Sequence, residues 1–154
     1  MTWKPNVTVA AIIERGGRFL FVEETSGGNI VINQPAGHVE AGESLLDAVV
    51  RETLEETGYH FQPSYLVGIY YWHATRKGIT YMRFAFSGTI TGHDADRPLD
   101  EGILRATWLT RDALAAQSAR HRTPVVVCCL DDYLAGKQYP LETITTLLPG
   151  TKTS

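Results

Sequence analysis

Residues 37–59 of this 154-residue chain form a segment that reads GHVEAGESLLDAVVRETLEETGY. Its second half carries apolar residues at steps of three and four, which is the spacing of one face of an α-helix. Ser44 and Asp47 have the spacing of a capping box at a helix N-terminus, and Gly58 stands where a C-terminal cap is expected. The pattern therefore predicts a helix from about Leu45 to Thr57.

Glutamates gather on one side of this predicted helix. Glu52, Glu55 and Glu56 stand at positions i, i+3 and i+4, so they fall within an arc of roughly 100°, away from the centre of the apolar stripe. Like charges at this spacing destabilise a helix by roughly 0.2–0.5 kcal/mol per pair, so the cluster needs an explanation. One explanation is a solvated acidic face, which is common on exposed helices. The other is a site for a hard divalent cation, Mg2+ or alternatively Mn2+, because these ions prefer carboxylate oxygens.

The loop before the helix favours the cation site. The chain matches the pattern G-x5-E-x7-R-E-U-x-E-E-x-G-U, where U is a bulky apolar residue, at Gly37, Glu43, Arg51, Glu52, Glu55, Glu56 and Gly58. Each specified residue type has an average frequency of roughly 5–7%, so a chance match is on the order of a few in a billion per starting position. The stretch therefore resembles the Nudix box. Thr53 and Tyr59 depart from its two U positions, and neither belongs to the carboxylate set.

Runs of β-branched and aromatic residues on both sides of the helix predict strands. Residues 6–14 and 19–22 are two such runs separated by Gly16-Gly17, which predicts a hairpin. Residues 65–74 and 79–90 predict a second antiparallel pair. The other expected elements are a loop at 34–43 and helices at 111–117 and 124–134.

The resemblance implies an α+β Nudix fold, with a mixed β-sheet sandwiched between helices. It extends over essentially the whole chain, so we expect residues 1–154 to form a single Nudix hydrolase domain. Within the superfamily the chain is most similar to bacterial NudJ-type phosphatases, on the basis of Lys4-Pro5 and of residues 22–25, 33–38 and 138–142. That similarity implies Mg2+-dependent hydrolysis of nucleoside di- and triphosphates, and of the pyrophosphate of a thiamine precursor.

The resemblance also assigns roles to the residues of the box. Glu52 and Glu56 are the implied direct ligands of the metal, and the carbonyl oxygen of Gly37 joins them. Glu55 either ligates the metal or orients the water that attacks phosphorus. The metal site is therefore expected to combine side chains of the helix with backbone of the preceding loop.

The general base and the residue that orients the carboxylates are assigned in the same way. Glu55 is the first choice for the base, and Asp100 and Glu101 in a later polar loop are the alternatives. An exposed acidic turn would account for Asp100 and Glu101 equally well. Arg51 is expected to hold the carboxylates in place, through a bidentate contact to Glu43.

The second predicted strand pair offers two candidates for substrate contact. Arg83 is a charge within an otherwise apolar run and would bind a substrate phosphate, but a solvent-facing position on an antiparallel strand explains it equally well. His73 lies beside Tyr71 and Trp72 and would stack on a base or ring, although a histidine in an aromatic strand is more often simply packed.

Composition limits the expected partners. The net charge is −3 and the one short basic stretch is Arg120-His121-Arg122, so no nucleic-acid binding is expected. There is no signal-peptide pattern and no apolar run near the ~18 residues of a membrane span, so we expect a cytoplasmic protein without membrane contact. The expected partner is a small-molecule nucleotide or organic diphosphate, and the protein is expected to be a monomer or a homodimer.

Two alternative functions stay open. A MutT-like sanitation enzyme would release pyrophosphate from oxidised purine triphosphates, whereas a NudJ-type phosphatase would release orthophosphate. The second alternative is a non-catalytic, nucleotide-binding Nudix domain. Such domains commonly lose carboxylates of the box, and the retention of Glu43, Glu52, Glu55 and Glu56 in this chain favours an enzyme.

Overall fold

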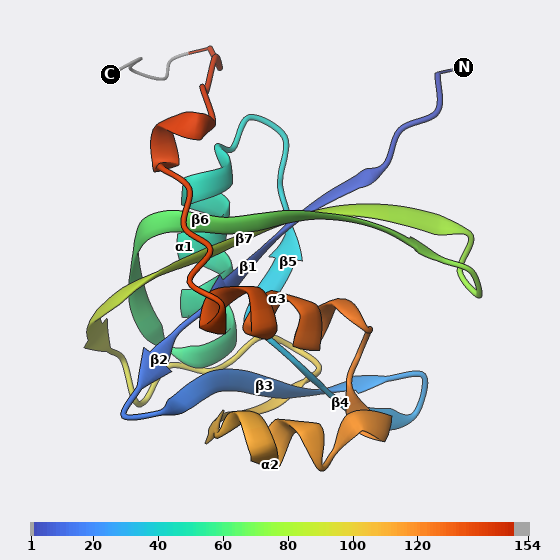
Figure 1. The fold of residues 1–154 in the computed structure, drawn as a ribbon, viewed down its shortest axis with the longest axis vertical. Coiled ribbons are helices and arrows are strands. Elements are labelled where there is room, and N and C mark those ends of the chain that lie inside the picture. Colours follow the sequence, from blue (N-terminus) through green and yellow to red (C-terminus); the bar gives the residue numbers. More distant parts are fainter. Residues whose placement is uncertain (1, 150–154) are drawn as a thin grey trace.

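The computed structural model describes residues 2–149 and contains two four-stranded β-sheets with helices around and between them (Figure 1). The first sheet has the order β5 (Ala36–His38), β1 (Asn6–Ile12), β7 (Ile79–His93), β6 (Tyr59–Ala74). The second consists of β2 (Glu14–Arg15), β3 (Arg18–Ser26), β4 (Asn29–Asn33) and β8 (Ile103–Leu109). The α-helices are α1 (Leu45–Thr57), α2 (Arg111–Ala115) and α3 (Val125–Leu134), and the 3-10 helices are Ser118–Arg120 and Leu141–Thr143.

The first sheet is mixed, since β1 runs parallel to β7 while the β1–β5 and β6–β7 pairs are antiparallel. Helix α1 covers one face of this sheet, and α3 lies between the two sheets (Figure 1). Buried side chains of both sheets meet α3 in one apolar cluster, which includes Ile12, Phe21 and Leu130. A second cluster, with Val49 and Phe86, joins α1 to the first sheet. The predicted α+β architecture, with a mixed sheet and packed helices, is confirmed.

Helix α1 has the predicted bounds because its caps are local features. The Ser44 hydroxyl oxygen accepts a hydrogen bond from the backbone N–H of Asp47 at 3.0 Å. Gly58 has a φ of 78°, a conformation that favours glycine, and its N–H donates to the Leu54 carbonyl. Thr53 is buried against the core, where its hydroxyl donates to the Val49 carbonyl at 2.7 Å. The polar residue at this box position is therefore satisfied within the helix.

The strand pairing differs from the prediction at the N-terminus. Gly16-Gly17 does form a hairpin turn, but it joins β2 to β3, and β1 belongs to the other sheet. Local sequence patterns identify strands and turns, whereas the parallel pairing of β1 with β7 joins residues more than seventy positions apart. The predicted loop at 34–43 contains the short strand β5. The sequence does not predict this strand because Pro35 and Gly37 are residue types typical of loops.

Strand register decides which side chains lie on the face of the first sheet opposite α1. Because side chains alternate along a strand and paired residues share a face, Tyr70, Arg83, Thr8 and His38 form one row across the sheet. Trp72 pairs with Tyr81 in the next row toward the hairpin tip.

Among the helices of residues 2–149, none has the length and apolar character that a membrane span needs.

Candidate active site

A cavity of about 700 Å3 opens between the two sheets. Its floor is the row of the first sheet that contains Arg83, and its opposite wall comes from β3, β4 and the start of α3. Glu52 and Glu56 enter the cavity from α1, and Gly37 enters from β5. The volume lies in the range of small-molecule sites, which is roughly 300–1,000 Å3. The acidic helix and the floor of the cavity therefore face the same space.

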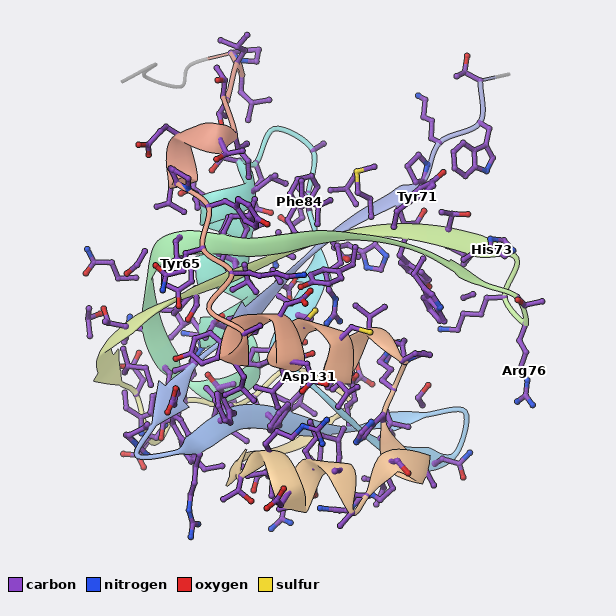
Figure 2. The ribbon with its side chains drawn as sticks, in the orientation of Figure 1. Tyr65, Tyr71, His73, Arg76, Phe84 and Asp131 are labelled. Atoms are coloured by element: carbon purple, nitrogen blue, oxygen red, sulfur yellow. The ribbon has the colours of Figure 1, made fainter. Side chains whose placement is uncertain are left out.

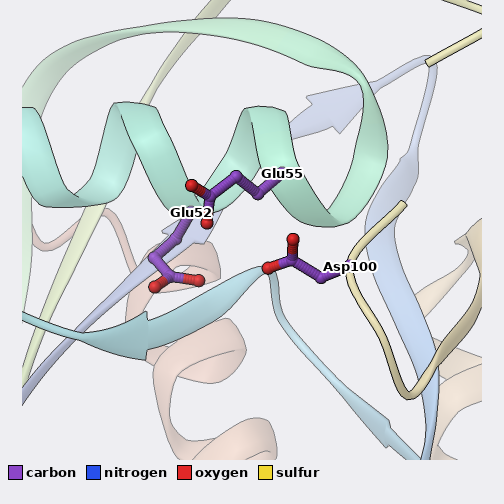
Figure 3. A group of neighbouring side chains, drawn as sticks. All are labelled: Glu52, Glu55 and Asp100. Carbon is purple, nitrogen blue, oxygen red and sulfur yellow. The ribbon is translucent and has the colours of Figure 1, made fainter. Parts of the chain in front are cut away.

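Three carboxylates converge beside this cavity (Figure 3). Glu52 and Glu55 come from α1 and Asp100 from the loop between β7 and β8, and one oxygen of each lies within 4.8 Å of the others. The loop is fixed to the helix because the backbone N–H of Asp100 donates to the Glu55 carbonyl at 3.0 Å. Glu101 is exposed and lies outside this group. The structure thus brings Asp100, but not Glu101, to the glutamates of the box.

Arg51 connects the carboxylates of the loop with those of the helix. Its guanidinium donates to both carboxylate oxygens of Glu43, at 2.7 and 2.9 Å, which is the predicted bidentate contact. It also donates to Glu52 at 2.8 Å, to Glu55 at 3.1 Å and to the His38 carbonyl at 3.1 Å. These hydrogen bonds hold the pKa of Glu43 below its usual value and raise the pKa of Arg51. Arg51 therefore remains charged and fixes the geometry of the cluster.

Glu56 has a different environment from the other glutamates. Its side chain is buried, and its carboxylate accepts a hydrogen bond from the Ala36 N–H at 2.9 Å. Burial is the main cause that raises the pKa of Glu56 to about 9; the nearby carboxylates of Glu52, Glu24 and Asp100 act in the same direction and the Ala36 N–H opposes them. Its carboxylate is not part of the 4.8 Å group found in residues 2–149. A nearby cation would favour its ionised form.

Gly37 allows Glu52 to occupy its position. A Cβ atom on Gly37 would collide with the Glu52 carboxylate, so a side chain here would displace a predicted metal ligand. Burial raises the pKa of Glu52, although the hydrogen bond from Arg51 opposes that effect. The donors gathered at this point are all oxygen atoms, and Mg2+ and Mn2+ prefer oxygen ligands. The residues present therefore fit a hard divalent cation.

Comparison with known proteins agrees with this geometry, since a family model described as NUDIX domain matches residues 2–127. The chain belongs to the Nudix family. Phosphatase NudJ from Escherichia coli K12 and from Shigella flexneri is 38% identical over 142 residues, which cover 92% of this chain and 92% of each relative. A NUDIX hydrolase structure from Nitrosomonas europaea superposes with a TM-score of 0.93 at 52% identity, covering 96% of this chain and 100% of that one.

A more distant structure, a MutT NUDIX hydrolase from Burkholderia pseudomallei, shares the fold at 21% identity with a TM-score of 0.72, over 84% of this chain and 98% of that one. The family indicated by the box is thus confirmed, and this Nudix enzyme is a hydrolase that acts on phosphoanhydrides. Nudix substrates are nucleoside diphosphate-linked compounds, and the family is typically dependent on divalent metal ions.

Arg83 lies in the cavity floor of this Nudix domain and is only 8% exposed, so the solvent-facing alternative is wrong. Its guanidinium donates to the amide oxygens of Gln34 at 2.9 Å and Asn33 at 3.0 Å. Gln34 is held in turn by a hydrogen bond from its Nε2 to the Val126 carbonyl at 2.7 Å. Within residues 2–149, no carboxylate forms an ion pair with Arg83. The cavity therefore contains a positioned cation whose charge is not compensated by the protein.

His73 does not reach the cavity. It is exposed, and its Nδ1 lies 2.9 Å from the Thr80 hydroxyl oxygen. Figure 2 shows His73 and Tyr71 on the β6–β7 hairpin, with Arg76 extending from its tip. Trp72, the residue between Tyr71 and His73, has the opposite orientation and lines the cavity. Sequence reasoning missed this residue, and the alternation of side chains along a strand was the signal that could have found it.

Proposed function

We propose that this enzyme uses Mg2+, with Mn2+ as the alternative, to hydrolyse nucleoside di- and triphosphates and pyrophosphates of the thiamine-precursor type. Attack would be by water at phosphorus. The observation that carries the proposal is that one cavity is lined by Glu52 and Glu56 and also by Arg83, the uncompensated cation. A metal at the carboxylates and a guanidinium on the floor provide the two kinds of positive charge that a diphosphate group requires.

Glu52, Glu56 and the Gly37 carbonyl, the ligands that the box resemblance implies, would hold the cation, together with whichever of Glu55 and Asp100 is not the general base. Bound there, a divalent cation offsets charge on phosphoryl oxygens and lowers the pKa of a water molecule. Arg51 would position Glu52 and Glu55 without touching the substrate. This division of roles is supported by the hydrogen bonds of Arg51 to the carboxylates of Glu43, Glu52 and Glu55, which compensate its charge.

The general base is assigned to Glu55, with Asp100 as the alternative. Both carboxylates lie in the group of three, whereas Glu101 lies outside it, which favours Asp100 over Glu101 as the alternative. Replacing each residue in turn by its amide would separate the two. Loss of the base removes the acidic limb of the pH profile of kcat, whereas loss of a ligand alone changes the Mg2+ requirement and leaves the limb in place.

Arg83 would bind a phosphate oxygen of the substrate. A buried charge without an ionic partner is costly unless its hydrogen bonds are satisfied, and Gln34 and Asn33 satisfy it with neutral acceptors only. The guanidinium is therefore held rigidly and retains its full charge for an anion. Its planar donors suit phosphate oxygens.

The purified protein should be assayed with Mg2+ against nucleoside di- and triphosphates and thiamine-type diphosphates, with orthophosphate and pyrophosphate measured separately. Glu56→Gln is the matched inactive control because it keeps size while removing charge. Orthophosphate from several substrates, lost in Glu56→Gln, supports the broad phosphatase. Pyrophosphate from one triphosphate would favour the MutT-like alternative. No turnover of any substrate would overturn the proposal and favour a nucleotide-binding domain.

A further inference from the structure

The cavity floor contains aromatic side chains as well as Arg83. Two large aromatic side chains, Trp72 and Tyr81, line the cavity and are only partly buried. They are cross-strand partners on β6 and β7, with ring centroids 6.1 Å apart and ring planes inclined by 19°. The two rings are nearly parallel and stack on each other, and both residues line the cavity.

We infer that Trp72 and Tyr81 form a stacking subsite for a planar heteroaromatic ring, so the substrate class is a diphosphate or triphosphate attached to such a ring. The inference rests on the proposed function, because it places the phosphate groups at Arg83 and at the carboxylates of α1. Aromatic side chains bind rings of this kind through their faces, with little regard to the pattern of substituents.

The spacing of the two subsites suits one small molecule. Tyr81 and Arg83 are two residues apart on β7 and share a face, which separates their Cα atoms by about 7 Å along the strand. Glu52 and Glu56 line the other side of the same cavity. A ligand with a ring at one end and phosphates at the other can therefore contact both subsites within about 700 Å3.

The outer end of the cavity gives the ring a second boundary. Thr123, Pro124 and Val125, at the start of α3, line the wall opposite the sheet. Arg76, which extends from the tip of the β6–β7 hairpin (Figure 2), and Lys77 also line the cavity. A ring on Trp72 would thus lie between an aromatic floor and a wall that includes the apolar residues Pro124 and Val125. The carboxylates of Glu52 and Glu56 thus lie at the end of the cavity beside α1, and Trp72 and Tyr81 lie nearer the hairpin tip.

Tyr71 provides an internal contrast. It is next to Trp72 in sequence and is 63% exposed, but it points to the other face of the sheet and does not line the cavity. Aromatic content of β6 by itself therefore does not make a subsite. A residue must also lie on the cavity face of the strand, as Trp72 does and Tyr71 does not. Substitutions of Trp72 and Tyr71 should therefore have different effects.

The test is steady-state kinetics of the full chain with Mg2+ and two substrates, ADP and inorganic tripolyphosphate, which has no ring. Trp72→Ala is expected to raise the KM for ADP about 10- to 100-fold, with kcat changed far less, because stacking contributes to binding. The KM for tripolyphosphate is expected to remain unchanged. Trp72→Phe should restore most of the affinity for ADP, and Tyr71→Ala is the matched control.

A second readout does not depend on turnover. The chain has three tryptophans, Trp3, Trp72 and Trp108, so ADP should quench the intrinsic fluorescence in the wild type and in Tyr71→Ala. Trp72→Phe should abolish the quenching while it retains a near-normal KM.

An unchanged KM for ADP in Trp72→Ala, or an equal rise for tripolyphosphate, would overturn the subsite and leave the hydrolase intact. If the wild type hydrolyses nothing, the proposed function fails, and the fluorescence titration still decides the subsite. Saturable quenching that requires Trp72 supports it, and absence of quenching overturns it.

Discussion

Two arginines of the site have different hydrogen-bond acceptors. Arg51 on α1 donates to the carboxylates of Glu43, Glu52 and Glu55, so its charge is fully compensated within the protein. Arg83 on β7 is equally well held, but its oxygen acceptors are the neutral amides of Asn33 and Gln34. Arg51, whose charge is compensated by carboxylates, therefore organises the site, whereas Arg83 lines the cavity with its charge unpaired and is available to a ligand.

Replacing Arg83 should have a larger effect on kcat/KM than the substitutions of Gly37 and Arg51 described below. Arg83→Met is expected to lower kcat/KM about 10²- to 10³-fold, which is the cost of removing one positioned donor to a reacting phosphoryl group. The Mg2+ concentration for half-maximal rate should not change, because Arg83 does not contact the carboxylate cluster. Arg105→Met, which removes a surface cation paired with Glu23, is the control of equal charge. A changed Mg2+ requirement with an unchanged kcat/KM would contradict the contrast between the two arginines.

Gly37→Ala should displace the Glu52 carboxylate. The new methyl group would occupy the position of that carboxylate, which is the flexible end of a side chain, so Glu52 can move and the fold should be retained. A displacement of about 1 Å at a catalytic group can cost about 100-fold in rate, so we expect kcat/KM to fall by that order. Circular dichroism and Tm should be nearly unchanged. Gly92→Ala, on strand β7 away from the cavity, is the control, and equal losses in the two variants would contradict the prediction.

Arg51→Lys tests the compensated side of the comparison. Lysine keeps the charge but cannot make the bidentate contact to Glu43, so Glu52 and Glu55 lose their fixed positions. We expect the Mg2+ concentration for half-maximal rate to rise about 10- to 100-fold, the usual effect of removing a group that orients metal ligands. Arg111→Lys changes a bidentate surface pair with Asp131 and is the matched control. An unaltered Mg2+ requirement would show that Arg51 does not orient the metal ligands.

The parts of this site that the sequence predicted are those with local causes. Helix α1 was predicted with its bounds because Ser44, Gly58 and the apolar spacing all lie within it or next to it. The Arg51–Glu43 contact followed from residues eight positions apart whose spacing matches a known motif. Features of this kind are determined by residues close together in the sequence and do not depend on how distant segments pair.

The parts that were missed depend on distant pairing or on register. The sequence does not predict that Asp100 lies beside the glutamates of α1, because the hydrogen bond from its backbone N–H to the Glu55 carbonyl joins residues far apart in the chain. Arg83 had two explanations because a strand pattern does not say which face is covered. His73 and Trp72 are neighbours, and a shift of one residue moves a side chain to the other face of a sheet. The cavity face of β6 could therefore be assigned only from the structure.

The last expected effect concerns the stability of the metal-free protein rather than catalysis. Glu56 has a pKa of about 9 in the folded state, against an ordinary value of 4.5, so between these values the unfolded chain binds fewer protons than the folded one. Stability should therefore be greatest at the acidic end and should fall as pH rises toward 9. In EDTA we expect Tm to fall between pH 5.5 and 8.5, and Mg2+ should oppose the fall because a cation stabilises the ionised carboxylate.

Glu56→Gln separates this effect from other titrations, because the amide can occupy the buried position without ionising. The burial that raises the pKa of Glu52 acts in the same direction and is present in both proteins, so only the difference between their curves belongs to Glu56. Without metal, the Tm of Glu56→Gln should exceed that of the wild type by several degrees at pH 8.5, and the gap should narrow toward pH 5.5. For a domain of about this size 1 kcal/mol corresponds to roughly 2–4 °C, so scanning calorimetry resolves the difference. Parallel curves of Tm against pH for the two proteins would mean that Glu56 is already ionised without a cation. The compensating positive charge would then have to come from the cavity itself, and Arg83 is the group able to supply it.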